Sequence, residues 1–156
     1  MRQGLQLVLA SDHAGFSLKQ ELISFLQSKD GVLVQDLGPH SPERCDYPDF
    51  AHRLCQAIQN EEATLGILVC GTGIGMSMTA NKHAGIRAAV VSDVFSAKAT
   101  RLHNDANVLC LGERVVGVGL AQEIVDAFIS TSFEGGRHQA RIDKMMSYDS
   151  VNLKSI

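Results

Sequence analysis

The chain has 156 residues, which suits one domain that buries roughly two thirds of the surface its unfolded form exposes. Hydrophobic residues make up 45% of it and only three residues are prolines, which excludes a disordered chain, and a net charge of −3 gives no overall attraction to nucleic acid or to an anionic membrane. No apolar span reaches about 18 residues and no signal-peptide pattern is found, so we expect a cytoplasmic protein whose partner is a small molecule.

The cysteines and histidines form no sequence pattern that binds a metal. The four cysteines are widely spaced and include no Cys-x-x-Cys pair, so neither a zinc site nor a thioredoxin-type dithiol is indicated. None of the six histidines forms a His-x-His or His-x-x-x-His pair, so we expect no metal and no cofactor. Cys55 and Cys110 lie within apolar patterns, and we expect both to be packed in the core as small hydrophobic residues.

Short apolar runs alternate along the chain with segments of helical spacing. The runs that predict strands are residues 5–10, 32–37, 67–69, 86–91 and 107–111, and helical spacing recurs in residues 16–26, 48–58, 76–82, 95–102 and 120–129. A β-α-β unit nearly always crosses over right-handed, which makes its two strands parallel. The pattern therefore predicts an α/β fold, a three-layer α/β/α domain around a five-stranded parallel sheet.

The alternation stops after residue 133. The segment Glu134-Gly135-Gly136 predicts a hinge, and a further helical pattern runs from Arg137 to about Asp149. We therefore divide the chain into an α/β domain of residues 1–133 and a C-terminal helical tail of residues 134–156. The tail carries apolar side chains that need a surface to cover, which we expect on a partner subunit: Ile142, Met145 and Met146.

Two arginines of the tail are four residues apart and so share one face of its helix. They are Arg137 and Arg141. Such a face is either solvated or a clamp for a phosphate group. The spacing alone favours a solvated face, because exposed arginines are common.

One stretch, residues 65–82, has the pattern of a strand, a turn and a helix. Its apolar strand ends at Cys70, at the edge of a parallel sheet where ligands bind, and the turn Gly71-Thr72-Gly73-Ile74-Gly75 follows. One glycine would be enough for a positive φ, so three glycines indicate backbone N–H groups that are open to an anion. The turn is neither a P-loop nor the dinucleotide fingerprint, whose third glycine comes one residue later, although Asp93 stands where such a site has an acidic residue.

Cys70 itself has two interpretations. It could be one more packed thiol. Alternatively, its place at the head of the glycine turn lets N–H dipoles stabilise a thiolate, which is suited to moving a proton. The residues alone leave both interpretations open.

Two other turns are rich in polar residues. Asp12 and His13 follow the first predicted strand, and His103 and Asn104 precede the fifth. Aspartate and asparagine commonly form turns by bonding their own backbone, and a histidine in a turn often faces solvent. These residues are therefore candidates for a site or ordinary turn residues.

Seven motifs, in the same order along nearly the whole chain, together resemble the ribose-5-phosphate isomerase B family. They are Ser11-Asp12-His13-Ala14-Gly15, Asp46-Tyr47-Pro48, Cys70-Gly71-Thr72-Gly73-Ile74-Gly75, Ala80-Asn81-Lys82, His103-Asn104-Asp105, Gly112-Glu113-Arg114-Val115-Val116-Gly117 and Glu134-Gly135-Gly136-Arg137-His138. The resemblance implies a Rossmann-like domain and a homodimer or homotetramer with shared active sites. It also implies cofactor-free interconversion of ribose 5-phosphate and ribulose 5-phosphate, as in the pentose phosphate pathway.

The resemblance also implies roles for individual residues. Cys70 is the base that moves a proton between C2 and C1 through an enediolate, and His103 is the acid that opens the furanose ring. Gly71 to Gly75, with Thr72, line an anion hole for the enediolate oxygen, which needs fixed donors. The sugar is bound by Asp12, Tyr47 and Asn104, and the phosphate by His13, Arg114, Arg137 and Arg141. The two tail arginines are expected to reach into the site of a neighbouring subunit, so here the phosphate clamp outweighs the solvated face.

The chain departs from part of the family at Met76. Some members carry a glutamate base there, directly after the third glycine, and since methionine cannot move a proton, Cys70 must act. Galactose-6-phosphate or allose-6-phosphate isomerase is the nearest alternative activity, because the choice between five- and six-carbon sugars depends on pocket size. An alternative of another class is a non-catalytic sugar-phosphate sensor in which Cys70 only packs; the pairing of Cys70 with His103 argues against it, since a sensor needs no acid and base.

Overall fold

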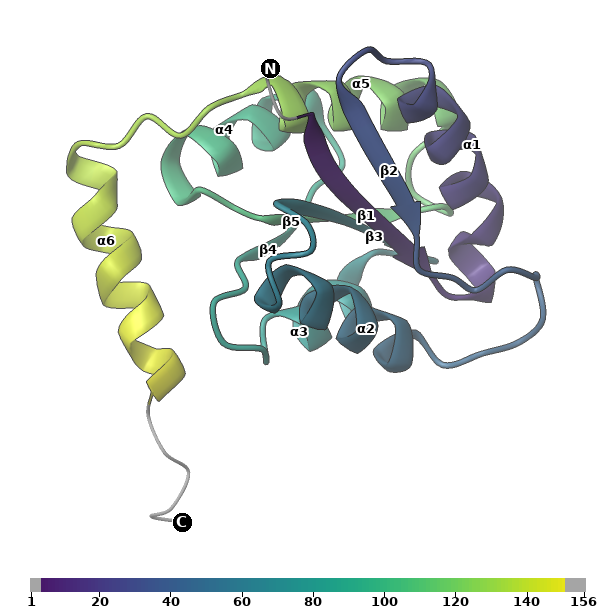
Figure 1. Ribbon diagram of the computed structural model, residues 1–156, viewed down its shortest axis with the longest axis horizontal. Coiled ribbons are helices and arrows are strands. Elements are labelled where there is room, and N and C mark those ends of the chain that lie inside the picture. The colour runs from purple at the N-terminus through teal and green to yellow at the C-terminus, as the bar shows by residue number, and fades with distance from the viewer. Residues whose placement is uncertain (1–3, 151–156) are drawn as a thin grey trace.

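The structure is a computed structural model that describes residues 4–150 (Figure 1). Residues 1–3 of the predicted domain and residues 151–156 of the predicted tail lie outside the described residues. The strands are β1 (Leu5–Ser11), β2 (Val32–Asp36), β3 (Leu65–Cys70), β4 (Ala88–Val90) and β5 (Val108–Gly112). The helices are α1 (Phe16–Gln27), α2 (Tyr47–Gln59), α3 (Ile74–Ala80), α4 (Val94–Asn104), α5 (Val118–Ser130) and α6 (Arg137–Met146), with 3-10 turns η1 (His13–Gly15) and η2 (Ser147–Ser150). Among these helices, none is long and apolar enough to cross a membrane.

The five strands form one parallel sheet in the order β2-β1-β3-β5-β4, which confirms the predicted fold class. Leu7 of β1 pairs with Leu65 of β3, and Cys70 at the end of β3 pairs with Gly112 at the end of β5. Because all the strands run the same way, their carboxyl ends share one edge of the sheet and their amino ends share the opposite edge.

The edge strand β4 is shorter than the predicted residues 86–91, and this part of the prediction was wrong. The N–H of Ile86 donates to the carbonyl oxygen of His83 at 3.2 Å, and the N–H of Arg87 donates to Oδ1 of Asn107 at 2.8 Å. Both N–H groups are used outside the sheet ladder, as is that of Ala88, which donates to Oδ1 of Asn81 at 2.8 Å, and Ala88 is the first residue of β4 that pairs with β5. A side-chain acceptor twenty positions away leaves no trace in the apolar pattern.

Two apolar layers cover the faces of the sheet. On β1, Leu7 and Leu9 point into the layer that includes α1 and α5, whereas Val8 and Ala10 point into the layer that includes α2 and α3. Figure 1 shows α1, α4 and α5 on one side of the sheet and α2 and α3 on the other. Both faces are covered, as the continuous apolar runs of the strands require.

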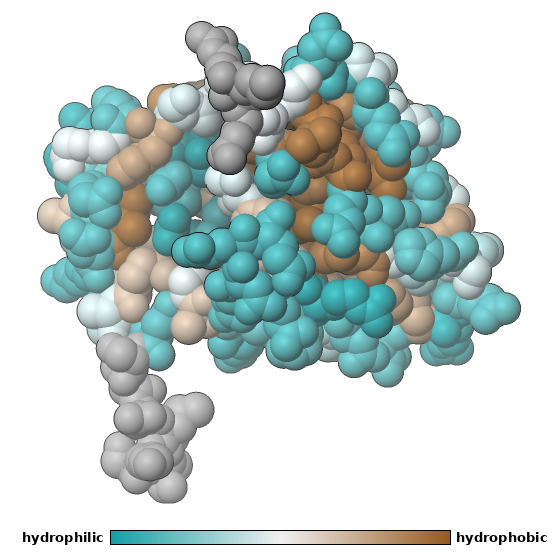
Figure 2. Space-filling model, in the orientation of Figure 1, coloured by the Kyte–Doolittle hydropathy of each residue, from teal (hydrophilic) through white to brown (hydrophobic). Residues whose placement is uncertain are grey.

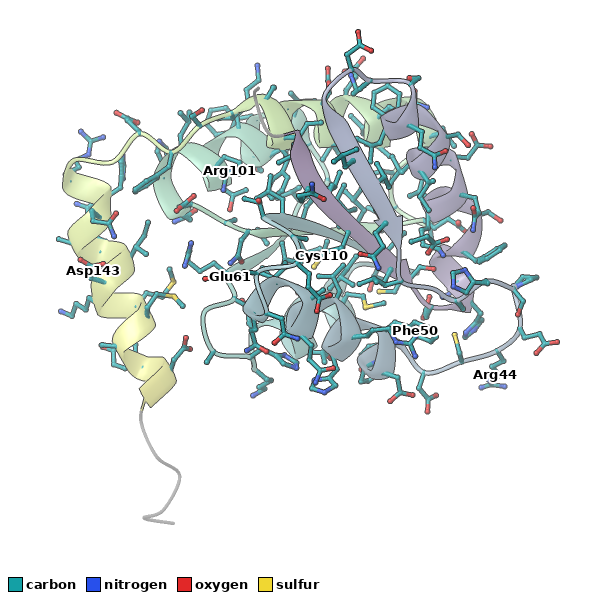
Figure 3. All side chains as sticks on the ribbon, in the orientation of Figure 1. Arg44, Phe50, Glu61, Arg101, Cys110 and Asp143 are labelled. Atoms are coloured by element: carbon teal, nitrogen blue, oxygen red, sulfur yellow. The ribbon has the colours of Figure 1, made fainter. Side chains whose placement is uncertain are left out.

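Two cysteines pack in the layer of α2 and α3, as predicted. Cys55 and Cys110 are fully buried, and Figure 3 shows Cys110 between the sheet and these helices. Burial disfavours the charged thiolate, so it raises the pKa of Cys55 to about 12 and the pKa of Cys110 well above its ordinary value. Neither thiol is suited to proton transfer.

A buried lysine ties α1 to the carboxyl end of β2. The side chain of Lys19 is fully buried, and its Nζ donates to Oδ1 of Asp36 at 2.6 Å and to the carbonyl oxygen of Pro39 at 2.7 Å. The same Oδ1 accepts from the N–H of Gly38 at 2.9 Å. The pair therefore fixes the start of the long loop that leads to α2.

Asp93 begins α4. Its Oδ1 accepts a hydrogen bond from the N–H of Ser96 at 2.6 Å, and this bond holds the pKa of Asp93 below its ordinary value. The capping role accounts for Asp93 at this strand end without a nucleotide.

The tail follows Gly135 and Gly136, which both have positive φ, a conformation that glycine adopts readily. The helix α6 that follows stands beside the β4 edge of the body (Figure 1). His138 and Ile142 are its buried residues. Figure 2 shows apolar surface on the side of α6 turned toward the body and polar surface on its outer side, where Asp143 accepts from Gln139 at 2.8 Å.

Candidate active site

Cys70 lies at the carboxyl edge of the sheet, where β3 runs directly into the glycine turn. All six residues of β3 are buried, and Cys70 is 5% exposed. Its Sγ accepts a hydrogen bond from the N–H of Gly73 at 3.1 Å. The N–H of Ile74 donates to Oγ1 of Thr72 at 3.2 Å, which closes the turn. The sulfur is thus held by the turn in a place where a donor would stabilise negative charge.

Each of the three positions in the turn requires glycine for a different physical reason. Gly73 has a φ of +79°, and a Cβ there would lie 3.0 Å from the carbonyl carbon of Leu111. A Cβ on Gly71 would lie 3.2 Å from the guanidinium of Arg114, and a Cβ on Gly75 would lie 2.8 Å from the ring of Tyr47. Only Gly73 therefore needs positive φ. The other two let the side chains of Arg114 and Tyr47 lie directly against the turn.

The residues that follow β5 are hydrogen-bonded to the backbone of the same turn. The N–H of Glu113 donates to the carbonyl oxygen of Cys70 at 2.9 Å, and the N–H of Arg114 donates to that of Gly71 at 3.1 Å. The side chain of Glu113 in turn accepts from the N–H of Leu18 at 2.5 Å, at the start of α1. These bonds fix the backbone beneath the Arg114 side chain.

Asp12 and His13 follow β1 at the same edge. Asp12 is buried, its N–H donates to the carbonyl oxygen of Val69 at 3.2 Å, and its Oδ1 accepts from the N–H of Gly15 at 3.0 Å. A carboxylate has a second oxygen and further lone pairs to offer a ligand. His13 is exposed, and its Nδ1 lies 3.1 Å from the carbonyl oxygen of Cys45.

The residues at this edge are called the cysteine cluster below. It consists of Asp12, His13, Tyr47, Cys70, Gly71, Thr72, Gly73, Ile74, Gly75 and Arg114.

His103 and Asn104 lie elsewhere, in the last turn of α4. With Arg141, Ile142 and Met145 of the tail they line a pocket of about 360 Å³. The ring of His103 stacks on the ring of His138, with 4.6 Å between centroids and 22° between planes. We call His103, Asn104, Glu134, His138 and Arg141 the histidine cluster.

Arg101 and the backbone of Glu134 hold this cluster in place (Figure 3). The guanidinium of Arg101 donates to Oδ1 of Asp105 at 2.9 Å, to the carbonyl oxygen of Ala106 at 2.6 Å and to that of Thr131 at 3.2 Å. The N–H of Glu134 donates to the carbonyl oxygen of Leu102 at 3.1 Å. The end of α4 and the start of the tail are therefore one joined unit.

The two clusters lie at opposite edges of the sheet within one chain. Cys70 ends β3, whereas His103 precedes β5 and so lies at the amino edge. The five residues of β5 span the distance between the edges, about 13 Å at a rise of about 3.3 Å per residue. The predicted phosphate ligands divide in the same way, with His13 and Arg114 in one cluster and Arg141 in the other. Arg137, exposed at the first position of α6, accompanies the histidine cluster.

Two residues beside His103 were missed from the sequence, namely Glu134 and His138. Their spacing of four residues was no helix signal, because Glu134 lies before α6 and Gly135 and Gly136, both with positive φ, separate it from His138. Nε2 of His138 lies 3.6 Å from Oε2 of Glu134. Their contact with His103, more than thirty positions earlier, has no local signature. Among the described residues these three are also the group of side chains that could hold a metal ion.

These features define a class of protein: an α/β domain that places a buried thiol and a glycine-rich turn, flanked by an arginine, at the ligand-binding edge of a parallel sheet. Such a site suits a small anionic ligand on which a proton is moved. The chain belongs to the ribose/galactose isomerase family, whose model matches residues 7–145.

Individual relatives agree with this placement. Ribose-5-phosphate isomerase B of Escherichia coli is 47% identical over 144 residues, which cover 92% of this chain and 96% of that protein. The solved structure of ribose-5-phosphate isomerase B from Clostridium thermocellum is 46% identical, covers 93% of this chain and 97% of its own, and superposes with a TM-score of 0.90. The structure of ribose-5-phosphate isomerase B from Mycoplasma genitalium with bound ribulose-5-phosphate is 42% identical, with coverages of 97% and 100% and a TM-score of 0.90.

Proposed function

We propose that this protein interconverts D-ribose 5-phosphate and D-ribulose 5-phosphate through an enediolate, as an aldose-ketose isomerase that needs no cofactor. The observation that carries the proposal is the contact between the Cys70 sulfur and the N–H of Gly73, at 3.1 Å, inside the glycine turn. It puts a proton acceptor and a set of backbone donors side by side. The Mycoplasma genitalium relative with bound ribulose-5-phosphate supports the choice of substrate.

Cys70 is the proposed base. As a thiolate it removes the proton from C2 of the open-chain aldose and returns it to C1, while the hydroxyl proton on O2 passes to O1, which gives the ketose. Negative charge develops on a substrate oxygen in the enediolate, and donors fixed before the reaction stabilise such charge better than mobile water. Within the turn, the N–H of Gly73 already donates to Cys70 Sγ and the N–H of Ile74 to Thr72 Oγ1, so the donors proposed for the enediolate oxygen are the N–H groups of Gly71, Thr72 and Gly75.

His103 is the proposed acid that opens the furanose ring, and it comes from a second copy of the chain. One chain holds Cys70 and His103 at opposite edges of its sheet. In a two-fold dimer the histidine cluster of one subunit can face the cysteine cluster of the other, and symmetry then completes two identical sites. The protein is accordingly a homodimer, or a homotetramer built from two such dimers.

The surface beside the cysteine cluster suits such a partner. Ile74, Val90 and Val115 are 48%, 44% and 56% exposed, and with Thr72 they line a shallow pocket of about 310 Å³. An apolar rim next to a polar site is typical of a surface that another protein chain covers. The tail of residues 134–156 is proposed to pack on that partner, because exposed Met145 extends its apolar side.

The phosphate is bound by four basic side chains, two from each subunit. Arg114 and His13 approach from the cysteine cluster, and Arg137 and Arg141 from the partner's tail. Guanidinium groups bind phosphate oxygens through paired, charge-assisted hydrogen bonds. Asp12 and Tyr47 of one subunit and Asn104 of the other bind the sugar hydroxyls. The cytoplasm, which holds thiols reduced, is the compartment proposed for an enzyme that works through Cys70.

The test is turnover in deuterium oxide with ribose 5-phosphate, galactose 6-phosphate and allose 6-phosphate, before and after exhaustive EDTA treatment. We expect ribose 5-phosphate to be converted fastest, with solvent deuterium at C1 of the ribulose 5-phosphate formed and no loss of activity to EDTA. Faster turnover of a six-carbon substrate would assign the alternative activity. Binding without turnover would identify a sensor, and a loss restored by Mg²⁺ or Mn²⁺ would contradict cofactor-free chemistry.

A further inference from the structure

We propose that His103, Glu134 and His138 form a binding site for a divalent transition metal ion of the Zn²⁺ and Co²⁺ type, and that occupation of this site inhibits the enzyme. The inference goes beyond the proposed reaction, in which no metal takes part. Two imidazoles and one carboxylate are a ligand set that such ions prefer, and they leave one coordination position for water.

The distances suit this ligand set. One possible ligand atom from each residue lies within 4.8 Å of the other two, and Nε2 of His138 lies 3.6 Å from Oε2 of Glu134. Tetrahedral ligands at about 2.0 to 2.2 Å from a metal are about 3.3 to 3.6 Å apart from one another. His103 and Glu134 are exposed, so both side chains can move the remaining distance without disturbing the core.

His138 gives independent support. The residue is 6% exposed, and its Nε2 has no hydrogen-bond partner among the described residues. A buried ring nitrogen left without a partner is unfavourable, and a metal ion would satisfy it. The nitrogen faces the carboxylate of Glu134, which provides the negative charge that attracts a cation.

The backbone keeps the three residues together. Glu134 precedes α6 and is bonded through its N–H to the carbonyl oxygen of Leu102, next to His103 in α4, and His138 is the second residue of α6. Ile142 buries the next turn of α6 and holds the helix against α4. The proposed ligands therefore come from the end of α4, the segment before α6 and the first turn of α6, which the hydrogen bond between Glu134 and Leu102 joins.

Metal binding and the proposed catalytic role exclude each other. A metal bound to His103 takes the lone pair of a ring nitrogen, and the ring must leave its stacked position on His138 to reach the ion. The ring can then no longer deliver a proton to the substrate. Arg141 lines the same pocket and repels cations, so the carboxylate of Glu134 is needed to offset it.

The test is calorimetric titration of the tag-free full-length protein with Co²⁺, followed by the same titration of Glu134→Gln and His138→Gln. We expect one Co²⁺ per chain in the unchanged protein and affinity at least about tenfold lower in both variants. His52→Gln is the matched control, because it removes a histidine from the exposed pair in which Nδ1 of His52 lies 2.7 Å from Nε2 of His83. Its affinity should be unchanged.

Thermal melting shows whether each variant is folded, and Glu134→Gln changes only an exposed side chain. Unchanged Co²⁺ affinity in folded Glu134→Gln, or loss of binding in His52→Gln, would place the metal elsewhere and overturn the proposal. Absence of Co²⁺ binding to the unchanged protein would do the same. Because binding is measured directly, these outcomes do not depend on whether the protein isomerises ribose 5-phosphate. Inhibition of that reaction by Co²⁺, weakened in Glu134→Gln, would further support the site.

Discussion

Cys70 and His103 lie at opposite edges of the central sheet of one chain, the first at the end of β3 and the second before the start of β5. In the proposed mechanism, which uses both residues at one site, a complete site takes two copies of the chain. We expect an equal mixture of Cys70→Ala and His103→Gln subunits, refolded together, to recover about a quarter of wild-type activity, since half of randomly formed dimers are mixed and one of their two sites is intact. The measurement is kcat per chain.

Each variant refolded alone is the control and should be nearly inactive. Two variants that stay inactive after verified mixing would show that both residues act within one chain, against the separation of the two edges.

Cys70→Ala should lower kcat by about 10² to 10⁴-fold, the usual contribution of a general base, and leave ribulose 5-phosphate binding nearly intact. The reason is that the phosphate is proposed to be bound by other residues. Cys55→Ala is the control, because this thiol is fully buried away from the turn and should leave kcat unchanged. If Cys70→Ala kept more than about a tenth of wild-type kcat, another group would be the base.

The double substitution Arg137→Ala/Arg141→Ala should raise KM for ribose 5-phosphate at least about a hundredfold, since two charge-assisted contacts are each worth roughly 1.5 to 3 kcal/mol. The oligomeric state, measured by analytical ultracentrifugation, should not change, because the apolar residues of the tail remain. Lys144→Ala removes a positive charge from the same helix and is the control. A normal KM in the double variant would show that these arginines are ordinary surface residues that do not bind the phosphate.

Asp36→Asn should lower the free energy of unfolding by about 3 kcal/mol, because it leaves the buried charge of Lys19 without its counterion. Asp126→Asn is the matched control. Its partner Lys29 lies 2.7 Å away, but both side chains are partly exposed, so the loss should stay below about 1 kcal/mol. Urea unfolding measures the free energy of unfolding of both variants. Equal losses would mean that burial does not strengthen the ion pair of Lys19 and Asp36.

The raised pKa of Cys55, about 12, predicts a pH dependence of stability. A thiol kept neutral by the fold stabilises the native state fully below its ordinary pKa of 9.0, and this contribution is lost as pH rises from there toward about 12. The stability of the unchanged protein should therefore fall faster than that of Cys55→Ala above pH 9.0. Parallel urea-unfolding curves for the two proteins across this range would contradict the assignment.

Much of the fold could be predicted from the sequence because buried parallel strands leave continuous apolar runs. The run that ends at Cys70 is an example, and all six residues of β3 are buried. β4 was predicted too long because the apolar run of residues 86–91 does not show which residues pair, and only Ala88 to Val90 pair with β5. A local sequence pattern shows the type of each residue, but it does not show its hydrogen-bond partners or strand pairings elsewhere in the chain.

Only part of the candidate site could be predicted from the sequence. The resemblance supplied roles for Cys70 and His103, and the chain order already places one after a strand and the other before a strand, so their separation within a chain could have been drawn from connectivity. The stack of His103 on His138 could not, because it depends on how the tail returns to the end of α4. Why glycine is needed at positions 71 and 75 could not be predicted either, because the need arises from the side chains of Arg114 and Tyr47, which lie directly against these two residues.

The separation of the two clusters also predicts that the turnover rate per chain depends on protein concentration. If the site is divided between two subunits as proposed, a folded subunit that is not yet associated carries two half-sites, neither of which can complete the reaction. Specific activity then follows the fraction of chains that are associated, so dilution, dissociation or slow assembly after synthesis lowers the rate without any change in a folded subunit.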